Sequence, residues 1–367
     1  MRVPSRPLLI AGLVLVLVGC GSATPTGHKG SSAPGHGLLF TYAANPKSNS
    51  WCRCGDDIYL WAGSVLFQPH RLTNSPSDPK GDPQWSPDGR EIAWDMVSPA
   101  LCKQDAETCG GKFGCVDEVW VASSTGAVPR TVSPPYRDSS NNPGCSTAPS
   151  WSPNGKQLVF ERISDTAPPN FAILTLGTKA LRRLPVRAEG IGGAPAWGRP
   201  GIAYIHTTRI HHPVSGEVAD QIRVVDPATG SLKFSIRLNW RKAGDNFGYL
   251  AWSSRGELAA VEGKRIVVYS STGRKVADFG APRSQEAVAL TSPLVWSPDG
   301  KRLLVCVDPF GGLSVKAHQK LVNTAAKRSR YPAPVPYLVN PGGARWQRFE
   351  LPNPKEKETV CSATSWR

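Results

Sequence analysis

Residues 83–89 read Pro-Gln-Trp-Ser-Pro-Asp-Gly, and variants of this heptapeptide return along the whole chain. Further copies begin at residues 149, 195, 250 and 294, and a partial copy ends the chain as Ser365-Trp366-Arg367. The tryptophans of these six copies, which lie 44 to 70 residues apart, are Trp85, Trp151, Trp197, Trp252, Trp296 and Trp366. Repeats of roughly 40–50 residues are typical of propeller blades and solenoid turns. The chain is therefore a repeat protein.

Each repeat has the local chemistry of β-strands. The Asp-Gly or Asn-Gly turn of a copy is followed by a short apolar run, such as residues 91–94 (Glu-Ile-Ala-Trp) or 157–160 (Gln-Leu-Val-Phe). A second apolar run, such as residues 265–269 (Arg-Ile-Val-Val-Tyr), ends in a glycine-containing turn, here residues 271–273. Short β-rich runs bounded by turn residues predict strands. We expect four antiparallel strands in each repeat and no helix of convincing length.

The two ends of the propeller sequence complement each other. Residues 38–42, 57–61 and 70–73 resemble the second, third and fourth strands of a blade whose first strand is missing. The terminal copy at residues 365–366 is a first strand with nothing after it. Joining the two completes one blade and closes a ring, which leaves only short, protected sheet edges. The predicted fold is an all-β, six-bladed β-propeller.

At these motifs the chain resembles the TolB-type propeller family, whose repeat is Pro-x-Trp-Ser-Pro-Asp-Gly before an apolar strand. The match is close at residues 83–94, 149–160 and 294–305, whereas the copies at 195 and 250 have lost Ser-Pro-Asp. We expect the tryptophans to pack between blades. We expect hairpin turns at Asp88-Gly89, Asn154-Gly155 and Asp299-Gly300. The resemblance covers residues 37–367 and implies a fold without implying one function.

The N-terminus has the features of an export signal. A short basic region with Arg2 and Arg6 precedes an apolar run at residues 8–18, which is too short to span a bilayer as a folded helix. Residues 17–20 (Leu-Val-Gly-Cys) resemble the bacterial lipobox, which implies that Cys20 is lipidated and becomes the mature N-terminus. We therefore predict a signal peptide at residues 1–19, a flexible lipid-anchored tether at residues 20–36 and the propeller at residues 37–367.

Disulfides are expected in an exported chain, because its compartment is oxidising. Without Cys20, the candidates are Cys52, Cys54, Cys102, Cys109, Cys115, Cys145, Cys306 and Cys361. Eight cysteines allow 105 pairings, and their spacing does not choose among them. A metal site is disfavoured because no second Cys-x-x-Cys-like pair and no nearby histidine accompany them. Cys306 and Cys361 are the best-motivated pair, because both flank the expected seam of the ring.

The topology of an up-and-down blade separates short from long connections. Connections from the second to the third strand, and from the fourth strand to the next blade, leave from one face of a propeller. All eight cysteines and the long insertions fall on this face, while the opposite face has tight turns. Binding sites concentrate in long loops on rigid scaffolds. The basic insertion on this face provides the predicted partner-binding residues, which are Lys316, Lys320, Lys327, Arg328 and Arg330.

The charge of the chain limits the class of partner. The formal net charge is +15, and removal of Arg2 and Arg6 with the signal peptide leaves +13. Outside the cytoplasm such a surface suits an acidic envelope protein, an anionic envelope polymer or lipid headgroups rather than nucleic acid. The membrane is reached through the lipid anchor, on the periplasmic or cell-surface side. We expect a monomer that requires no cofactor.

Enzyme motifs are scarce in the sequence. It has no Gly-x-Ser-x-Gly motif and no hydrolase domain after the propeller, so we assign no catalytic residue. His206, His211 and His212 lie on one insertion. Glu217 and Asp220 are the only acidic residues near them and have no firm ligand spacing, which favours a solvated loop over a metal site. The predicted function is a non-catalytic protein-binding scaffold tethered at the bacterial cell envelope. The alternative is a propeller enzyme or receptor that acts on a small molecule or glycan at the tunnel mouth.

Overall fold

The computed structural model describes residues 36–43, 56–62, 69–74, 80–97, 117–141, 143–164, 169–186, 191–209, 218–238, 247–280, 289–308, 335–343, 345–349 and 363–367. All of them belong to one compact unit, residues 32–367. They form β-strands and no helix, so none of the described segments is a helix that could cross a membrane. The predicted signal peptide (residues 1–19), Cys20 and the predicted tether up to residue 35 lie outside these residues.

The strands assemble into six antiparallel sheets, which are the predicted blades. Blade 1 contains β25 (Ala363–Trp366), β1 (Leu38–Ala43), β2 (Asp56–Trp61) and β3 (His70–Arg71), and blade 2 contains β4 (Lys80–Trp85), β5 (Glu91–Val97), β6 (Asp117–Ser123) and β7 (Arg130–Thr131). Blade 3 contains β8 (Tyr136–Arg137), β9 (Pro143–Trp151), β10 (Gln157–Ile163), β11 (Asn170–Thr175) and β12 (Ala180–Arg183), and blade 4 contains β13 (Ile191–Gly198), β14 (Gly201–Arg209), β15 (Val218–Val225) and β16 (Leu232–Arg237). Blade 5 contains β17 (Phe247–Trp252), β18 (Leu258–Glu262), β19 (Arg265–Tyr269) and β20 (Lys275–Gly280), and blade 6 contains β21 (Ala289–Trp296), β22 (Leu303–Asp308), β23 (Val335–Asn340) and β24 (Arg345–Arg348).

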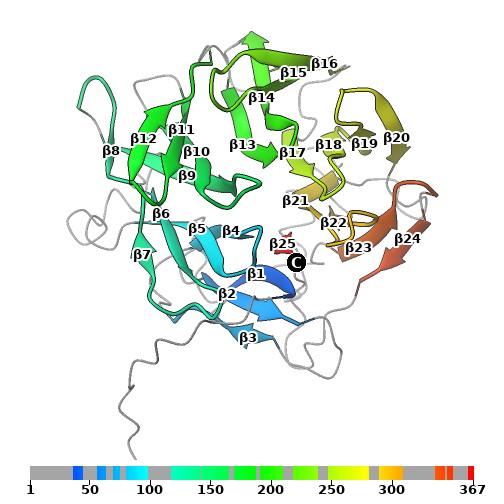
Figure 1. The fold of residues 1–367 in the computed structure, drawn as a ribbon. Helices are drawn as coiled ribbons and strands as arrows, with labels where there is room; N and C mark the ends of the chain where they lie inside the picture. Colours follow the sequence, from blue (N-terminus) through cyan, green and yellow to red (C-terminus); the bar gives the residue numbers. More distant parts are fainter. Residues whose placement is uncertain are drawn as a thin grey trace, which may run out of the picture. The chain divides into compact units, whose positions relative to one another are not determined.

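The six sheets surround a central axis in chain order (Figure 1). The innermost strand of each blade is the one that carries the repeated tryptophan, and neighbouring inner strands contact one another all the way round, from β25 through β4, β9, β13, β17 and β21 back to β25. Blade 1 therefore faces blade 4 across the axis. The six-bladed, all-β fold predicted from the repeat is confirmed.

The ring closes where the two ends of the chain meet. Strand β25 pairs antiparallel with β1, with Leu38 opposite Trp366 and Leu39 opposite Ser365. The Gly37 N–H donates to the Arg367 carbonyl at 2.6 Å, and the Arg367 N–H donates to the Gly37 carbonyl at 3.1 Å. The last strand of the sequence thus supplies the first strand of the first blade, as predicted.

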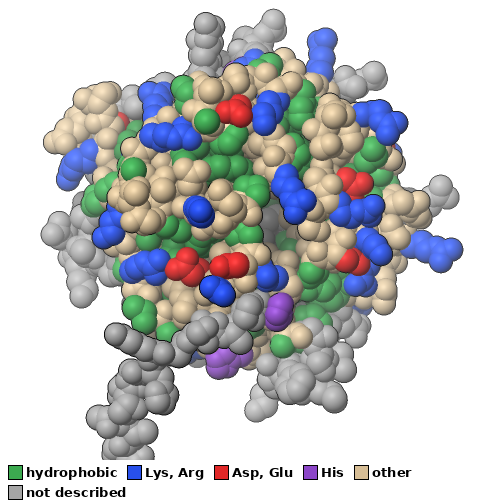
Figure 2. All heavy atoms as spheres, viewed as in Figure 1, with side chains coloured by type: hydrophobic (Ala, Val, Ile, Leu, Met, Phe, Trp, Pro, Cys, Tyr) green, Lys and Arg blue, Asp and Glu red, His purple; other side chains and the backbone are tan. Residues whose placement is uncertain are grey.

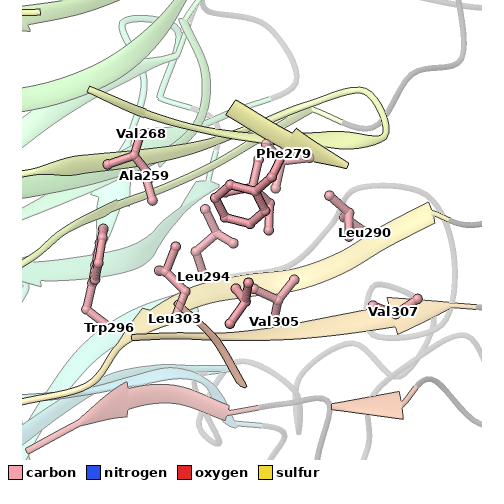
Figure 3. Packing of buried hydrophobic residues seen from close by; sticks show 12 residues of the cluster. Ala259, Val268, Phe279, Leu290, Leu294, Trp296, Leu303, Val305 and Val307 are labelled. Carbon is pink, nitrogen blue, oxygen red and sulfur yellow. The ribbon is translucent and has the colours of Figure 1, made fainter. Parts of the chain in front are cut away.

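The core lies between the blades rather than inside one sheet, since each sheet packs its faces against its two neighbours. Figure 3 shows the contact between blades 5 and 6. There Ala259, Val268 and Phe279 of blade 5 form one cluster with Leu290, Leu303 and Val305 of blade 6, and all six are buried. Buried apolar area of this kind contributes about 25 cal/mol per Å². Each blade is therefore stabilised mainly by its neighbours.

The repeated tryptophans also join neighbouring blades by hydrogen bonds. The Trp151 Nε1–H donates to the Gln84 carbonyl at 3.1 Å, and the Trp296 Nε1–H donates to the Ala251 carbonyl at 2.9 Å. Each acceptor is the residue before the tryptophan of the preceding blade. The indole thus buries its ring and satisfies its N–H in one contact. The structural role predicted for these two tryptophans is confirmed.

Blade 1 and blade 2 share a buried ion pair beside the seam. The Lys80 Nζ lies 3.1 Å from the Asp57 Oδ1, and the two side chains are 1% and 0% exposed. Asp57 also pairs with Arg71 and accepts a 2.8 Å hydrogen bond from the Thr73 Oγ1. A change of either residue would weaken the compensation of a charge that stays buried, which costs more than the net gain from the pair.

Blade 3 departs from the predicted four strands by gaining a short fifth one. Strand β9 runs for 9 residues and extends past its neighbours, so Tyr136 and Arg137 of β8 pair with Gly144 and Pro143 at its start. A Cβ at position 144 would lie 2.7 Å from the Tyr136 ring. The absence of a side chain at Gly144 is what lets β8 approach.

Two of the predicted disulfide cysteines are described by the structure. Cys145 is a buried thiol on strand β9, which corrects its assignment as a disulfide cysteine in a connecting loop. Cys306, on β22, is disulfide-bonded, and its partner lies outside the described residues. The pairing with Cys361 stays a prediction. The remaining candidates, Cys52, Cys54, Cys102, Cys109, Cys115 and Cys361, lie outside the described residues.

Deletion of residues 363–367 should destabilise the whole propeller, because it removes Trp366 from the seam and exposes the edge of β1. We expect a loss of at least about 3 kcal/mol in the free energy of unfolding, the lower end for removing a large aromatic side chain from a core. Urea unfolding followed by tryptophan fluorescence measures this loss. An unchanged transition would contradict closure through β25.

Candidate functional site

A central cavity of about 750 Å³ runs between the inner strands. The residue before the tryptophan of each complete copy lines it: Gln84, Ser150, Ala196, Ala251 and Val295. Most of these side chains are short. The wall is therefore made largely of backbone groups, hydroxyls and the edges of proline and tryptophan rings.

The inner strands are bulged where their prolines lie. The pairing of β4 with β5 shifts register between Gly81 and Gln84, around Pro83, which has no N–H to donate to the ladder. Asp82, directly before Pro83, has a positive φ of 41° and lines the cavity. At the corresponding position of blade 3, the N–H of Ala148 donates to the buried Asp95 Oδ2 at 2.8 Å. A carboxylate of one blade thus supports the bulge of the next.

The Ser-Pro-Asp-Gly and Ser-Pro-Asn-Gly segments form the turns that follow the inner strands. The Ser297 Oγ donates to the Asp299 Oδ1 at 2.5 Å, and the Lys301 N–H donates to the same oxygen at 3.1 Å. Asn154 accepts the equivalent bonds from the Ser152 Oγ and the Lys156 N–H, at 2.8 and 3.0 Å. The turn role predicted for Asp88, Gly89, Asn154, Gly155, Asp299 and Gly300 is confirmed, since the three glycines have φ between 65° and 72°.

These hydrogen bonds hold the turn carboxylates in their ionised form. The bonds from the Ser297 Oγ and the Lys301 N–H keep the pKa of Asp299 below the 3.8 of an unperturbed aspartate. At Asp88 burial opposes ionisation, but the bonds from the Ser86 Oγ and the Arg90 N–H outweigh it and lower the pKa. Each carboxylate therefore stabilises the turn in which it lies.

The degenerate copies place cations where the intact copies have small or apolar residues. Pro87, Pro153 and Pro298 line the cavity two residues after their tryptophans, and Arg199 occupies this position in blade 4. In blade 1 Arg367 follows Trp366 directly, where the intact copies have serine. Arg199 and Arg367 both line the cavity, on opposite blades. The sequence analysis did not identify these two arginines as site residues. The available signal was that each replaces the residue found at the same position in the intact copies.

The two arginines differ in how they are held. The Arg367 guanidinium donates to the carbonyls of Ser86, at 3.3 Å, and Pro87, so it fastens the chain end to blade 2. Arg199 is exposed and makes no ion pair with the described residues. Next to it, a Cβ at Gly198 would lie 2.3 Å from the Trp252 ring. Loss of the serine in this copy thus makes room for the tryptophan of blade 5.

The predicted partner-binding residues, Lys316, Lys320, Lys327, Arg328 and Arg330, lie outside the described residues. The same holds for His211 and His212, the two further residues of the disfavoured metal site, whereas His206 is buried on β14. No group of three or more metal-ligating side chains occurs within the described part of the chain. The cavity is therefore the site that the described geometry defines.

Comparison with known proteins supports the fold class. No family model and no curated protein matches the sequence. Among solved structures, TolB from Acinetobacter baumannii is similar with a TM-score of 0.53 and 19% identity over 85% of this chain, which covers 63% of that protein. The periplasmic gluconolactonase PpgL from Pseudomonas aeruginosa is similar with a TM-score of 0.50 and 13% identity, over 85% of this chain and 81% of that one.

At these identities the likeness establishes a shared fold and nothing about activity. The chain is a six-bladed β-propeller that resembles TolB in structure, as the sequence motifs predicted. It spans less than two thirds of the length of that TolB.

The substitution Asp299→Asn should weaken the acid sensitivity of the protein while preserving the turn, because Asn154 makes the same hydrogen bonds in blade 3. A carboxylate with a lowered folded pKa contributes stability that is present above the unfolded pKa, and this contribution is lost as the pH falls through the folded pKa. Below about pH 4 the wild type should therefore lose stability faster than the variant. Urea midpoints across this pH range measure the difference.

Asp299→Ala is the matched control, because it removes the acceptor at every pH and should lower stability at neutral pH as well. Equal pH slopes for wild type and Asp299→Asn would show that this carboxylate does not contribute.

Proposed function

We propose that this propeller is a non-catalytic binding module, located outside the cytoplasm and tethered to the envelope membrane through Cys20. The ring is a rigid scaffold, and its partner is an acidic protein of the envelope. The face that carries the long connections binds this partner. The basic residues of the insertion at 309–334 contribute the contacts.

The observation that carries the proposal is the unequal length of the connections at the two ends of the blades. In the five blades where both are described, the connections from first to second and from third to fourth strand contain two to six residues. The connection between β22 and β23 contains 26 residues, 309–334, and that between β5 and β6 contains 19, 98–116. Insertions confined to one face of a rigid ring are typical of a binding surface.

The cavity favours a second candidate, a receptor or enzyme for a small molecule or glycan. Its volume of about 750 Å³ falls within the usual range of ligand sites, roughly 300–1,000 Å³. Arg199 and Arg367 would give it a preference for anions. Binding of a small anion that depends on Arg199 and leaves partner capture unchanged would support this candidate over the first.

The binding proposal is tested by capture from solubilised envelopes. The full chain is immobilised, and bound proteins are identified by mass spectrometry. A variant with Lys316, Lys320, Lys327, Arg328 and Arg330 changed to Gln should retain less than about a tenth of the captured partner, and added salt should reproduce that loss, since exposed charges are screened within about 8 Å. Asp88→Ala and Asp299→Ala, on the opposite face, are the controls. Normal capture by the five-fold variant would place the binding face elsewhere.

Anchoring is tested separately by Cys20→Ser. This change removes the thiol that accepts the lipid, so the protein should no longer be processed to a lipidated form and should leave the membrane fraction or keep its leader. Fractionation and the mass of the intact protein report the outcome. An unaltered mature mass with the same membrane association would exclude Cys20 as the anchor.

A further inference from the structure

The short turns form one end of the propeller, here called the turn face, and they are rich in cations. The turn face consists of the described turns at residues 86–90, 124–129, 152–156, 176–179, 199–200, 226–231, 253–257, 270–274, 297–302 and 341–343, together with Arg367. Its basic residues are Arg90, Lys156, Lys179, Arg199, Arg255, Arg274, Lys301, Arg302 and Arg367. Its acidic residues are only Asp88, Asp226, Glu257 and Asp299.

The repeat places at least one of these cations in every blade. Every blade has one at the end of its inner strand or in the turn that follows: Arg367, Arg90, Lys156, Arg199, Arg255 and Lys301 in blades 1 to 6. Because the blades are arranged as a ring, these six residues are distributed around the turn face, and two of them, Arg199 and Arg367, line the cavity. Figure 2 looks along the tunnel and shows Lys and Arg side chains around the central hollow, with fewer Asp and Glu.

Most of these charges are not neutralised by the protein. Of the nine basic residues, Arg90 alone has a carboxylate within 4.0 Å, that of Asp88, among the described residues. Lys156, Arg199 and Arg255 are exposed and form no ion pair in that part of the chain. A set of like charges on one surface raises the potential there and attracts anionic partners.

The chain enters the propeller at this same face. Gly37 is hydrogen-bonded to Arg367 through both backbone groups, and His36 lines the cavity. The residues before His36 therefore begin from the turn face. Between Cys20 and the propeller are 16 residues, 21–36, whose Gly-rich and Ser-rich composition gives a mean reach of roughly 20–25 Å. A lipid on Cys20 would hold the turn face close to the membrane.

We propose that the turn face is a membrane-docking surface that lies on anionic lipid headgroups. The described turns contain two to six residues each, and every blade contributes a cation to this face, so a planar bilayer offers headgroups to all six blades together. A linear polyanion would contact only some of them at a time. The proposal goes beyond the proposed function, because it assigns the second face of the propeller. It would leave the long connections facing away from the membrane, toward partners.

The test measures binding to vesicles without the lipid anchor. Purified full-length chain carrying Cys20→Ser is mixed with vesicles of equimolar phosphatidylglycerol and phosphatidylcholine, or of phosphatidylcholine alone. Sedimentation gives the bound fraction. The leader is common to all variants, so its contribution cancels in their comparison. We expect binding to anionic vesicles that weakens as salt increases.

The turn-face variant combines Lys156→Gln, Arg199→Gln and Arg255→Gln, in blades 3, 4 and 5. Each basic residue near an anionic membrane contributes about fivefold to binding, so the variant should bind anionic vesicles at least about tenfold more weakly. The matched control combines Arg183→Gln, Arg237→Gln and Lys264→Gln, which change the same three blades and the same net charge at the opposite ends of their strands. The control should bind like the parent.

Loss confined to the turn-face variant supports the proposal. Equal loss in both variants, no loss in either, or no preference of the parent for anionic vesicles would overturn it. Binding of soluble poly(glycerol phosphate) without binding of vesicles would also overturn it and assign the turn face to an envelope polymer. Partner capture is measured on the other face without vesicles, so failure of that proposal is distinguishable from failure of this one.

Discussion

The pairing of β25 with β1 is the contact on which the rest of the propeller depends. A blade buries its faces only against its neighbours, so a missing inner strand in blade 1 would open the interfaces with both blade 2 and blade 6. Trp366 is among the residues packed against the cluster that joins blades 1 and 6, and the Ser365 Oγ accepts a 3.0 Å hydrogen bond from the Trp85 N–H of blade 2. One strand of four residues therefore completes two interfaces.

A hydrogen bond from a tryptophan N–H to a serine of the preceding blade also links blades 3 and 4. The Ser150 Oγ accepts the Trp197 N–H at 3.0 Å, as Ser365 does for Trp85. Blade 4 has Ala196 in place of this serine, so it has no hydroxyl to accept such a bond. At the same interface the Trp252 ring occupies the space over Gly198, although its Nε1–H has no partner within the described residues. Packing has replaced hydrogen bonding at that interface. The ring persists because buried aromatic area, rather than any one polar contact, supplies most of the stabilisation.

The division of the molecule into two faces follows from the blade topology. Hairpins that join adjacent strands by tight turns keep their cations near one plane, whereas the other connections can lengthen freely because loops tolerate insertion. The cations of the tight turns therefore share one surface, which the formal charge of +15 by itself does not reveal. A docking face and a binding face on opposite ends of one ring would let the propeller remain at the membrane while its long connections meet a partner.

The sequence by itself determined the number of blades, the closure of the ring and the turn chemistry, because each is visible in local patterns: six tryptophan copies, complementary chain ends and three intact Ser-Pro-Asp/Asn-Gly turns. The tight turn after Ser297 needs an acceptor two residues later and a glycine with positive φ, and both requirements are visible as Ser-Pro-Asp-Gly. The extra strand β8 was missed, because a two-residue strand has no pattern of its own.

The tertiary structure alone decided which distant residues share a surface. Arg199 and Arg367 are 168 positions apart (367 minus 199), and only the order of the blades places them across one cavity. The cations of the turns are scattered in the sequence and gather because the ring repeats one geometry. Cys145 was indistinguishable from the other cysteines as a disulfide candidate, because spacing in the sequence does not show which cysteines meet in the fold. Local chemistry thus specified the blades, and the closed ring specified the surfaces.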